Sequence, residues 1–409
     1  MKNPFDIKIA DYNYELPPDK IAQFPPEERD ASKVLIYDNG KISESVFKDI
    51  ADYLPGNSFL VLNNTKVIQA RLHFYKETGA FIEIFCLEPH QPELNLHSKG
   101  NAVWKCLVGN AGKWKYGPLK KKFVHNSKKF ELSAEILDRE KDYFIIKFEW
   151  NNENITFSDI LSDIGRMPLP PYIKRDALGI DKSRYQTVYA EIDGSVAAPT
   201  AGLHFTDEVL NIMEKKGIEI NRITLNVGTG TFKPVKCEMI KDHIMHSERI
   251  NVSKEFIMKL SNSLDKPIIS VGTTTLRTIE SLYWLSVKLN LNLLHNPDEL
   301  ILEQWEPYTL EPILSPYEAL EILIAYLERN ELQFITAQTG ILIAPGYEFK
   351  FADTLMTNFH LPKSTLLLLI AAFVGEDWKK IYQYALGNNF RFLSYGDSSL
   401  LRRQSAINN

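Results

Sequence analysis

Pro267-Ile-Ile-Ser-Val-Gly-Thr-Thr-Thr275 is the segment that decides the fold class of this chain. Its first half is a short apolar run typical of a buried strand, and Gly272 with the threonines that follow is typical of a turn that opens a helix. A strand, a glycine turn and a helix start in this order resemble the switch-point loops of open α/β sheets. The amides of such a helix start can hold a carboxylate or a phosphate, although a well-capped helix without a ligand is the alternative.

Residues 69–151 differ in texture from the segments that flank them. Short runs that alternate apolar and polar residues, such as Phe81–Leu87, are separated by turn residues and lack helical periodicity. This pattern predicts a small β-barrel or sandwich. Because a buried strand is predicted at residues 58–63 and the chain is mixed after residue 151, the flanks are expected to rejoin in one sheet. We therefore predict a mixed α/β main domain over residues 1–68 and 152–409, with a small β-barrel domain inserted at residues 69–151.

Composition and charge bound the class of protein. The chain has 409 residues, of which 44% are hydrophobic, and its formal net charge is −5, so two or three globular domains are expected. No window approaches about 18 uninterrupted apolar residues, and Met1–Asp6 lacks the apolar core of a secretion signal. The three cysteines form no Cys-x-x-Cys pair, which indicates a reducing compartment and argues against structural zinc. We expect a cytoplasmic monomer without a membrane span.

A lysine-rich stretch inside the predicted barrel stands out against the acidic balance. Aromatic side chains interleave with its lysines, as they do where a protein holds single-stranded RNA. Solvated lysines along a sheet edge, which block aggregation, are an alternative of equal weight. The stretch contains Lys113, Trp114, Lys115, Tyr116, Lys120, Lys121, Lys122, Phe123, Lys128 and Lys129.

Val196-Ala-Ala-Pro-Thr-Ala-Gly-Leu-His-Phe-Thr206 is typical of a tight substrate pocket. Pro199 bars regular pairing, and Gly202 lets a ligand or another backbone come close. Small side chains around His204, a single proton-carrying group, suit a flat or bulky substrate. A buried turn whose imidazole hydrogen-bonds to a carbonyl is the alternative, and it is favoured for this segment taken alone.

Two other loops gather polar groups. Arg166–Lys174 contains three prolines that stiffen it, so it could display cations and an aromatic ring to phosphates and bases, or serve as an interdomain linker. Gly228-Thr-Gly230 lacks the third glycine of a dinucleotide loop, but it still offers backbone amides.

His243-Ile-Met-His-Ser-Glu248 is the segment that most resembles a metal or proton-transfer site. Its spacing differs from the His-Glu-x-x-His of zinc hydrolases, and no third ligand is evident, so metal binding is the least favoured interpretation. A base or hydrogen-bonding pair beside a substrate is favoured over it, and a hydrogen-bond network within the protein is the alternative.

A last loop gathers Thr357, Asn358, His360 and Lys363, and function often lies on such loops. Ser364 is placed to cap the apolar helix that follows it. Further along, Phe390–Asp397 is predicted to be a strand that ends in a glycine and a carboxylate.

Long motifs spread over nearly the whole chain carry a resemblance to one family. They include Leu62-Asn-Asn-Thr-Lys-Val67, Met167-Pro-Leu-Pro-Pro-Tyr-Ile173, Arg184-Tyr-Gln-Thr-Val-Tyr189, Ala197–Thr206, His243–Glu248, Gly272–Thr275, Thr357–Leu366 and Ser394–Asp397. In these motifs the chain resembles the S-adenosylmethionine:tRNA ribosyltransferase-isomerases of queuosine biosynthesis.

The resemblance implies an α/β domain with an inserted β-barrel, in agreement with the patterns above. It implies transfer of the ribosyl part of S-adenosylmethionine onto 7-aminomethyl-7-deazaguanine in a tRNA anticodon stem-loop, which gives epoxyqueuosine and releases adenine and methionine. S-adenosylmethionine would be a co-substrate, and no metal or redox cofactor is implied. The sulfonium acidifies the 5′-carbon, so a base beside it can start the reaction. The methionine carboxylate is expected at the helix start beside Gly272.

The motifs and the resemblance together give candidate roles. Catalytic candidates are His204, His243, His246, Glu248 and His360. Substrate-binding candidates are Arg166, Pro199, Thr200, Gly202, Gly228, Gly230, Gly272, Thr273, Thr274, Asn358, Lys363, Ser364, Tyr395 and Asp397. RNA-binding candidates are Lys113, Lys115, Tyr172 and Lys174.

The chain also departs from the usual pattern of the family. Asn226 stands where a histidine is usual, Asn64 and Lys66 replace an aspartate and an arginine, and Ala344 replaces an arginine. Residues 285–335 are longer than in a typical member. Losing a proton carrier at Asn226 could change the reaction or its acceptor. Two alternatives therefore stay open: a divergent paralogue that binds S-adenosylmethionine or a nucleoside but serves another acceptor, and a non-catalytic RNA-binding protein.

Overall fold

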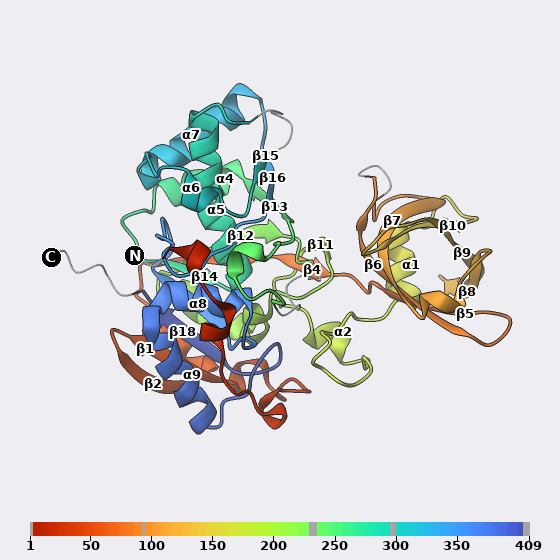
Figure 1. Cartoon of the computed structure of the whole chain (residues 1–409), viewed down its shortest axis with the longest axis horizontal. Coiled ribbons are helices and arrows are strands. Elements are labelled where there is room, and N and C mark those ends of the chain that lie inside the picture. Colours follow the sequence, from red (N-terminus) through yellow and green to blue (C-terminus); the bar gives the residue numbers. More distant parts are fainter. Residues whose placement is uncertain (1–2, 92–94, 229–234, 295–299, 404–409) are drawn as a thin grey trace.

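A large α/β domain and a smaller β-barrel to one side of it make up the molecule (Figure 1). The computed structural model describes residues 3–91, 95–228, 235–294 and 300–403. The predicted fold class, a mixed α/β main domain with an inserted small barrel, is confirmed. Within these residues, no helix is both long and apolar enough to cross a membrane.

A ten-stranded mixed sheet forms the centre of the main domain. Its four neighbouring strands β12, β3, β14 and β17 run parallel, so their carboxyl ends meet at one edge of the sheet. In spatial order the strands are β15 (Leu300–Leu302), β16 (Phe334–Thr339), β13 (Glu248–Ser253), β12 (Glu219–Leu225), β3 (Phe59–Asn63), β14 (Ile268–Val271), β17 (Thr354–Asn358), β18 (Ser398–Arg402), β1 (Lys33–Asp38) and β2 (Lys41–Val46).

The centre of this sheet is buried on both faces, as strand β3 shows. Every residue of β3 is buried, and its alternate side chains serve two cores. Phe59 and Val61 belong to the core with the longer helices, whereas Leu60 and Leu62 pack on the opposite face. The first core contains α4 (Lys254–Ser261), α5 (Thr273–Asn290), α7 (Pro316–Arg329), α8 (Thr365–Val374) and α9 (Trp378–Gly387), and the second contains α3 (Asp207–Lys215).

The smaller domain is an antiparallel six-stranded sheet that curls into a barrel. Strands β8 and β5 at its two ends are tied where the Lys121 Nζ donates to the His73 carbonyl at 2.8 Å. Helix α1 (Phe157–Ile164) follows the last strand, and its Phe157 ring packs against Trp104 and Phe148 inside the barrel. In order, the strands are β5 (Arg71–Tyr75), β6 (Phe81–Pro89), β7 (Asn101–Gly109), β10 (Phe144–Trp150), β9 (Lys128–Arg139) and β8 (Leu119–His125).

The chain enters and leaves the barrel at one point. Arg71 and Arg166 form a backbone bridge there, with N–H to carbonyl distances of 3.3 and 2.9 Å. The barrel core reaches past residue 151, because α1 belongs to it. Four short strands and α-helices remain among the described residues. Strand β4 (Thr65–Val67) pairs in parallel with β11 (Ile192–Ser195). The short helices are α2 (Asp181–Arg184) and α6 (Glu306–Thr309).

The predicted strand at Phe390–Asp397 is wrong. Only Phe392 forms an isolated bridge, and Leu393 has a φ of 70°, which breaks extended structure. The Asp397 carboxylate explains the turn, because it accepts the backbone N–H groups of Lys33 at 3.0 Å and Arg391 at 2.7 Å. A short loop is therefore folded around one buried acid.

Candidate active site

Two adjoining pockets lie at the carboxyl edge of the parallel strands, where open α/β sheets usually bind ligands. The inner pocket has an open volume of about 710 Å³. The outer pocket has about 1540 Å³, and the two share Leu366 in their walls. The inner pocket is lined by Ala197–Ala201, Gly272–Thr274, Thr357–Leu361, Tyr172, Val227, Ser364, Leu366, Leu393 and Ser394. The outer pocket is lined by Leu87, Glu88, Val196, Gly228, Lys236, Cys237, Asp242–Glu248, Arg277, Thr365 and Leu366.

Small residues give the inner pocket its shape. Ala197, Ala198 and Ala201 come from one loop, and Gly272 closes the pocket beneath helix α5. Gly272 has a φ of 90°, which side-chain-bearing residues rarely adopt, and a Cβ there would lie 3.6 Å from the Ala201 Cβ. The resulting walls suit a flat, largely apolar group such as a heteroaromatic ring.

Asn358 and His204 form the main polar group of the inner pocket. The Asn358 Nδ2 donates to His204 Nε2 at 3.1 Å, and His204 Nδ1 lies 2.7 Å from the Ser32 Oγ. Burial, and then the cations Arg391 and Arg29, lower the pKa of His204 to about 3, so the ring is neutral at pH 7. His204 therefore lies behind Asn358 as its support, outside the pocket wall. Asn358 Oδ1 is buried and has no hydrogen-bond partner within the described ranges.

His360 does line the inner pocket, but its ring is held in place. Its Nε2 lies 3.0 Å from the Thr357 hydroxyl, and its backbone N–H donates to the Tyr382 hydroxyl at 3.1 Å. The Tyr14 hydroxyl donates to its carbonyl oxygen. Burial lowers the pKa of His360 to about 3, so this imidazole also stays neutral. Both inner histidines can hydrogen-bond or position a neighbour, and neither carries a positive charge near neutral pH.

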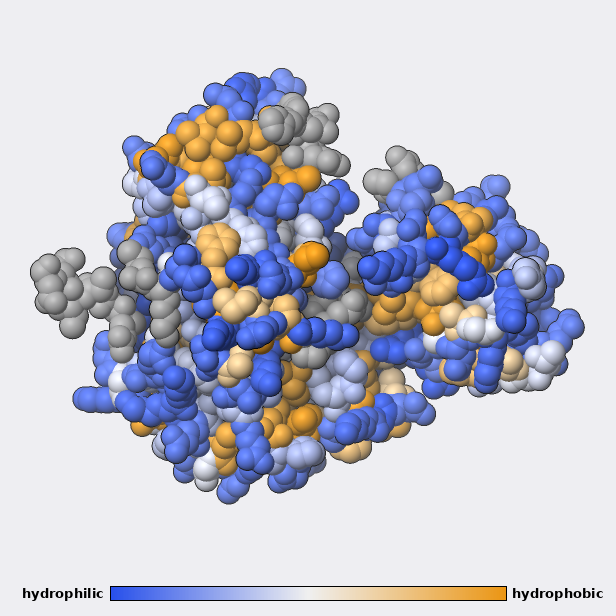
Figure 2. Space-filling model, viewed as in Figure 1, coloured by the Kyte–Doolittle hydropathy of each residue, from blue (hydrophilic) through white to orange (hydrophobic). Residues whose placement is uncertain are grey.

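The outer pocket lies between the two domains and carries the ionisable groups. Strand β6 of the barrel contributes Leu87 and Glu88, and the surface is hollowed between the domains in Figure 2. His243 and His246 line the same pocket. Burial, and then the neighbouring His246, lower the pKa of His243 below its usual value. In the part of the chain that the structure describes, no three His, Cys, Asp or Glu side chains are grouped so as to hold a metal ion.

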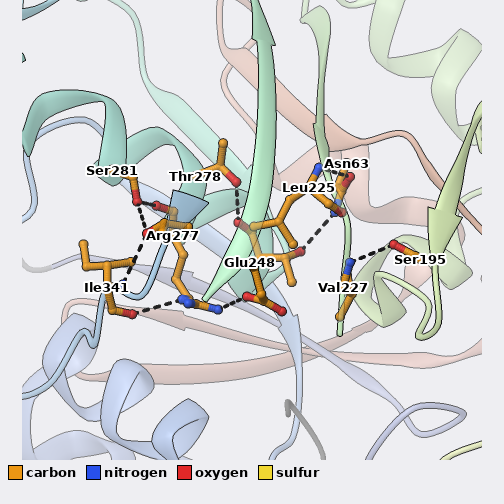
Figure 3. Close-up of polar contacts among 11 residues, drawn as sticks. Asn63, Ser195, Leu225, Val227, Glu248, Arg277, Thr278, Ser281 and Ile341 are labelled. Carbon is orange, nitrogen blue, oxygen red and sulfur yellow. Dashed lines mark hydrogen bonds and ion pairs between the residues drawn. The ribbon is translucent and has the colours of Figure 1, made fainter. Parts of the chain in front are cut away.

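An ion pair between Arg277 and Glu248 forms the back of the outer pocket. Arg277 is 5% exposed and Glu248 is 6% exposed, and the guanidinium Nε also donates to the Ile341 carbonyl at 3.2 Å (Figure 3). The Arg277 Nη2 is buried and has no hydrogen-bond partner among residues 3–91, 95–228, 235–294 and 300–403. Sequence reasoning named Glu248 but assigned no role to Arg277. The sequence does contain a signal that could have identified Arg277: it is a cation that lies one helical turn after the Gly272–Thr275 segment at the start of the helix.

Side-chain hydrogen bonds fix the loop that separates the two pockets (Figure 3). At the end of β3, Asn63 Oδ1 accepts the Leu225 N–H at 3.1 Å, and Asn63 Nδ2 donates to the Leu225 carbonyl at 3.1 Å. The Ser195 Oγ accepts the Val227 N–H at 2.8 Å. These bonds hold Val227 against the inner pocket and Gly228 against the outer one.

Several predicted substrate-binding residues line a pocket: Pro199, Thr200, Gly272, Thr273, Thr274, Asn358 and Ser364 line the inner one and Gly228 the outer one. Ser364 also caps α8, accepting the Leu367 N–H at 3.2 Å as predicted.

Other predicted substrate-binding residues lie in neither pocket. Gly202 packs under Tyr189, where a Cβ would fall 2.0 Å from the tyrosine hydroxyl. The Tyr395 hydroxyl donates to Asp181 at 2.7 Å, and Asp397 binds backbone amides. Lys363 and Arg166 are exposed. Gly230 lies outside the described residues.

The predicted RNA-binding residues lie on the barrel, in the loop before α2 and in the inner pocket. Lys113 and Lys115 are exposed on the barrel, and Lys174 is exposed in the loop before α2. Tyr172 instead lines the inner pocket, and its hydroxyl lies 2.6 Å from the Ser394 Oγ.

The departures from the family pattern lie outside both pockets. The Asn64 amide donates to Glu191 at 3.2 Å, and Lys66 pairs with Asp193 at 3.5 Å. The buried Ala344 donates its N–H to the Tyr308 hydroxyl at 2.9 Å. Asn226 accepts the Thr65 hydroxyl at 3.2 Å, and it is the one departure whose chain neighbour, Val227, lines a pocket.

Comparisons with known proteins agree on the family. A model described as "Queuosine biosynthesis protein" matches residues 9–401. The S-adenosylmethionine:tRNA ribosyltransferase-isomerase of Thermotoga maritima is 38% identical over 97% of this chain and 100% of its own length. The enzyme of the same name from Legionella pneumophila is 38% identical, over 96% and 98% respectively.

A crystal structure of the S-adenosylmethionine tRNA ribosyltransferase from Thermotoga maritima is also similar. It is 29% identical, covers 95% of this chain and 99% of its own, and has a TM-score of 0.44. With its family model and its full-length relatives in agreement, the chain belongs to the queuosine biosynthesis protein family.

Proposed function

We propose that this protein is an S-adenosylmethionine:tRNA ribosyltransferase-isomerase. In this reaction the ribosyl part of S-adenosylmethionine moves onto the aminomethyl group of a 7-deazaguanine in a tRNA anticodon, and adenine and methionine are released. The observation that carries the proposal is the pair of adjoining pockets on one sheet edge in a chain that matches this family from residue 9 to residue 401.

The inner pocket is assigned to the adenine of S-adenosylmethionine. Its alanine and glycine walls accept a flat ring, and the unpartnered Asn358 Oδ1 accepts a hydrogen bond from an exocyclic amino group. His204 keeps the Asn358 amide in the orientation that turns Oδ1 away from it. A neutral imidazole suits this task, because a protonated His204 could not accept the Asn358 N–H.

The outer pocket is assigned to the sulfonium, the 5′-carbon and the incoming aminomethyl base. Its larger volume and its position between the domains leave room for a nucleotide from the tRNA. His243 is the base we propose for the 5′-carbon, because its lowered pKa leaves it unprotonated near neutral pH. His246 is exposed beside it and is the second candidate.

The anticodon loop is proposed to bind across the junction of the two domains. Leu87 and Glu88 bring barrel strand β6 to the rim of the outer pocket, so a nucleotide held there contacts both domains. Lys113 and Lys115 on the barrel supply charge for the RNA backbone. An anticodon loop already presents its bases outside a helical stack, so no duplex needs to be opened.

The remaining expectations stay proposals. A reaction that expels adenine and methionine from a sulfonium needs neither an electron carrier nor a metal, so we propose that S-adenosylmethionine is the co-substrate and that no cofactor is required. We propose a cytoplasmic monomer, because tRNA is the substrate and the three cysteines Cys86, Cys106 and Cys237 are free. The two alternatives opened by the departures from the family pattern are less well supported, because those residues lie outside the pockets.

One incubation tests the function. Purified protein is mixed with S-adenosylmethionine and an anticodon stem-loop that carries 7-aminomethyl-7-deazaguanine. We expect free adenine in the supernatant and, on the RNA, the mass gain of the rebuilt ribosyl group. Adenine without a mass gain would favour another acceptor, and neither product would refute the proposal. A stem-loop with an unmodified guanine is the matched control and should gain no mass.

A further inference from the structure

We infer that the Arg277–Glu248 pair is the subsite for the zwitterionic amino-acid end of S-adenosylmethionine. The inference rests on the proposed function and adds what that function leaves open, namely which residues select the methionine part. Arg277 would take the carboxylate, and Glu248 would take the ammonium group.

The first argument is the unsatisfied guanidinium. Arg277 is only 5% exposed. Its Nε donates to the Ile341 carbonyl and its Nη1 to the Glu248 carboxylate. Its Nη2, however, has no hydrogen-bond partner in the described part of the chain. A buried charged donor without a partner is costly, so such groups usually await a ligand or an ordered solvent molecule. Arg277 lines the outer pocket, so a carboxylate bound there is the partner that we assign to this donor.

The second argument is the position of the pair along helix α5. Thr273 and Thr274, in the first turn of the helix, line the inner pocket, and Arg277 lines the outer one. One helical turn rises about 5.4 Å, so a single ligand lying along α5 meets both turns. Adenine in the inner pocket would therefore direct the other end of the same molecule toward Arg277. This places the carboxylate one turn into the helix, and not at the helix start beside Gly272, where the sequence motif had predicted it.

The third argument is the chemical match. An α-amino acid presents a carboxylate and an ammonium group within a few bonds of each other. Arg277 and Glu248 present the opposite charges side by side at the back of one pocket (Figure 3). A phosphate of the tRNA backbone fits less well, because it carries no ammonium group to pair with the buried Glu248 carboxylate and would be repelled by it.

Binding measurements on the full-length protein test the subsite without turnover. Three probes are compared by calorimetry: S-adenosylmethionine, its decarboxylated analogue and 5′-methylthioadenosine. We expect the wild type to bind S-adenosylmethionine about 10–100-fold more tightly than the decarboxylated analogue, since only the former can use Arg277. Arg277→Gln should remove this difference by weakening S-adenosylmethionine alone. Glu248→Gln should weaken both ammonium-bearing probes and leave 5′-methylthioadenosine unchanged.

A matched control comes from the same helix. Lys288 is a buried cation on α5 that pairs with Glu306 at 2.6 Å and lines neither pocket. Lys288→Met should leave all three affinities unchanged. If the wild type binds S-adenosylmethionine and its decarboxylated analogue equally, the subsite is refuted even if every variant fails to fold. If it binds no adenosyl compound at all, the proposed function fails together with the subsite.

Discussion

The inner and outer pockets share a sheet edge and the helices α5 and α8, but they differ in charge. The inner pocket is walled by alanines and a glycine, and both His360 in its wall and His204 behind Asn358 are neutral. The outer pocket holds Arg277, Glu248, His243 and His246, and these two histidines are less buried than His204 and His360. The difference indicates that the two pockets bind different ends of one ligand. The inner pocket holds an aromatic ring by its shape and by neutral hydrogen bonds, and the ionised groups of the outer pocket hold the charged end beside the reacting carbon.

The largest expected effect separates chemistry from binding. His243→Gln should lower adenine release in a single turnover by about 10²–10⁴-fold, because the base for the 5′-carbon is lost. Affinity for S-adenosylmethionine should change less than about twofold, since glutamine keeps a polar group of similar reach. His246→Gln is the companion variant and should cost less. A rate loss found only in His246→Gln would move the base to that residue.

A second contrast concerns the aromatic end of the ligand. Asn358→Leu removes the free acceptor of the inner pocket, and we expect affinity for both S-adenosylmethionine and 5′-methylthioadenosine to fall by about 10–100-fold. Calorimetry on the two ligands checks this. The Arg277 variant should discriminate between the same two ligands, so an Asn358 variant that also did so would contradict the assignment of adenine to the inner pocket.

The pH dependence of stability distinguishes the inner histidines from ordinary ones. Their pKa of about 3 in the folded protein lies below the pKa of about 6.5 in an unfolded chain. The unfolded chain therefore binds more protons below pH 6.5, and stability is lost as the pH falls from there toward 3. Each ring should cost about 2 kcal/mol of unfolding free energy between pH 6.5 and pH 5. Urea titrations of wild type and His204→Gln at both pH values measure the unfolding free energy. We expect the variant to lose less of it between pH 6.5 and pH 5 than the wild type does. An equal loss in the two proteins would contradict burial of the neutral His204 ring.

The smallest effect concerns the barrel. Lys113→Ala and Lys115→Ala should each weaken stem-loop binding about threefold and reduce the salt dependence by about one phosphate contact. Neither should alter S-adenosylmethionine affinity. Lys379→Ala, on helix α9 of the main domain, is the control. Equal losses in all three variants would show that the RNA senses net charge and not the barrel surface.

The sequence predicted the fold class because its signals are local. The segment at Pro267–Thr275 gave strand β14 and the start of α5, and alternating runs predicted the barrel. Where a carboxylate acts at long range, prediction failed: Asp397 folds Phe390–Asp397 into a loop by binding backbone amides.

The candidate site could be predicted only in part, because some of its contacts join segments that are far apart in the sequence. The loops that line the inner pocket were recognised, because small residues and a glycine turn are visible in sequence. Two facts were not recognised: that His204 lies behind Asn358, and that Arg277, which lines the outer pocket, has a buried donor without a partner in the described part of the chain. Both depend on packing between segments that are far apart in the chain, which a single sequence does not show.

A crystal structure of the protein with S-adenosylmethionine bound tests the central claim most directly. We predict an adenine whose amino group lies within hydrogen-bond distance of Asn358 Oδ1, and a methionine carboxylate on Arg277 Nη2. A ligand with its two ends reversed, or one bound away from both pockets, would contradict the account.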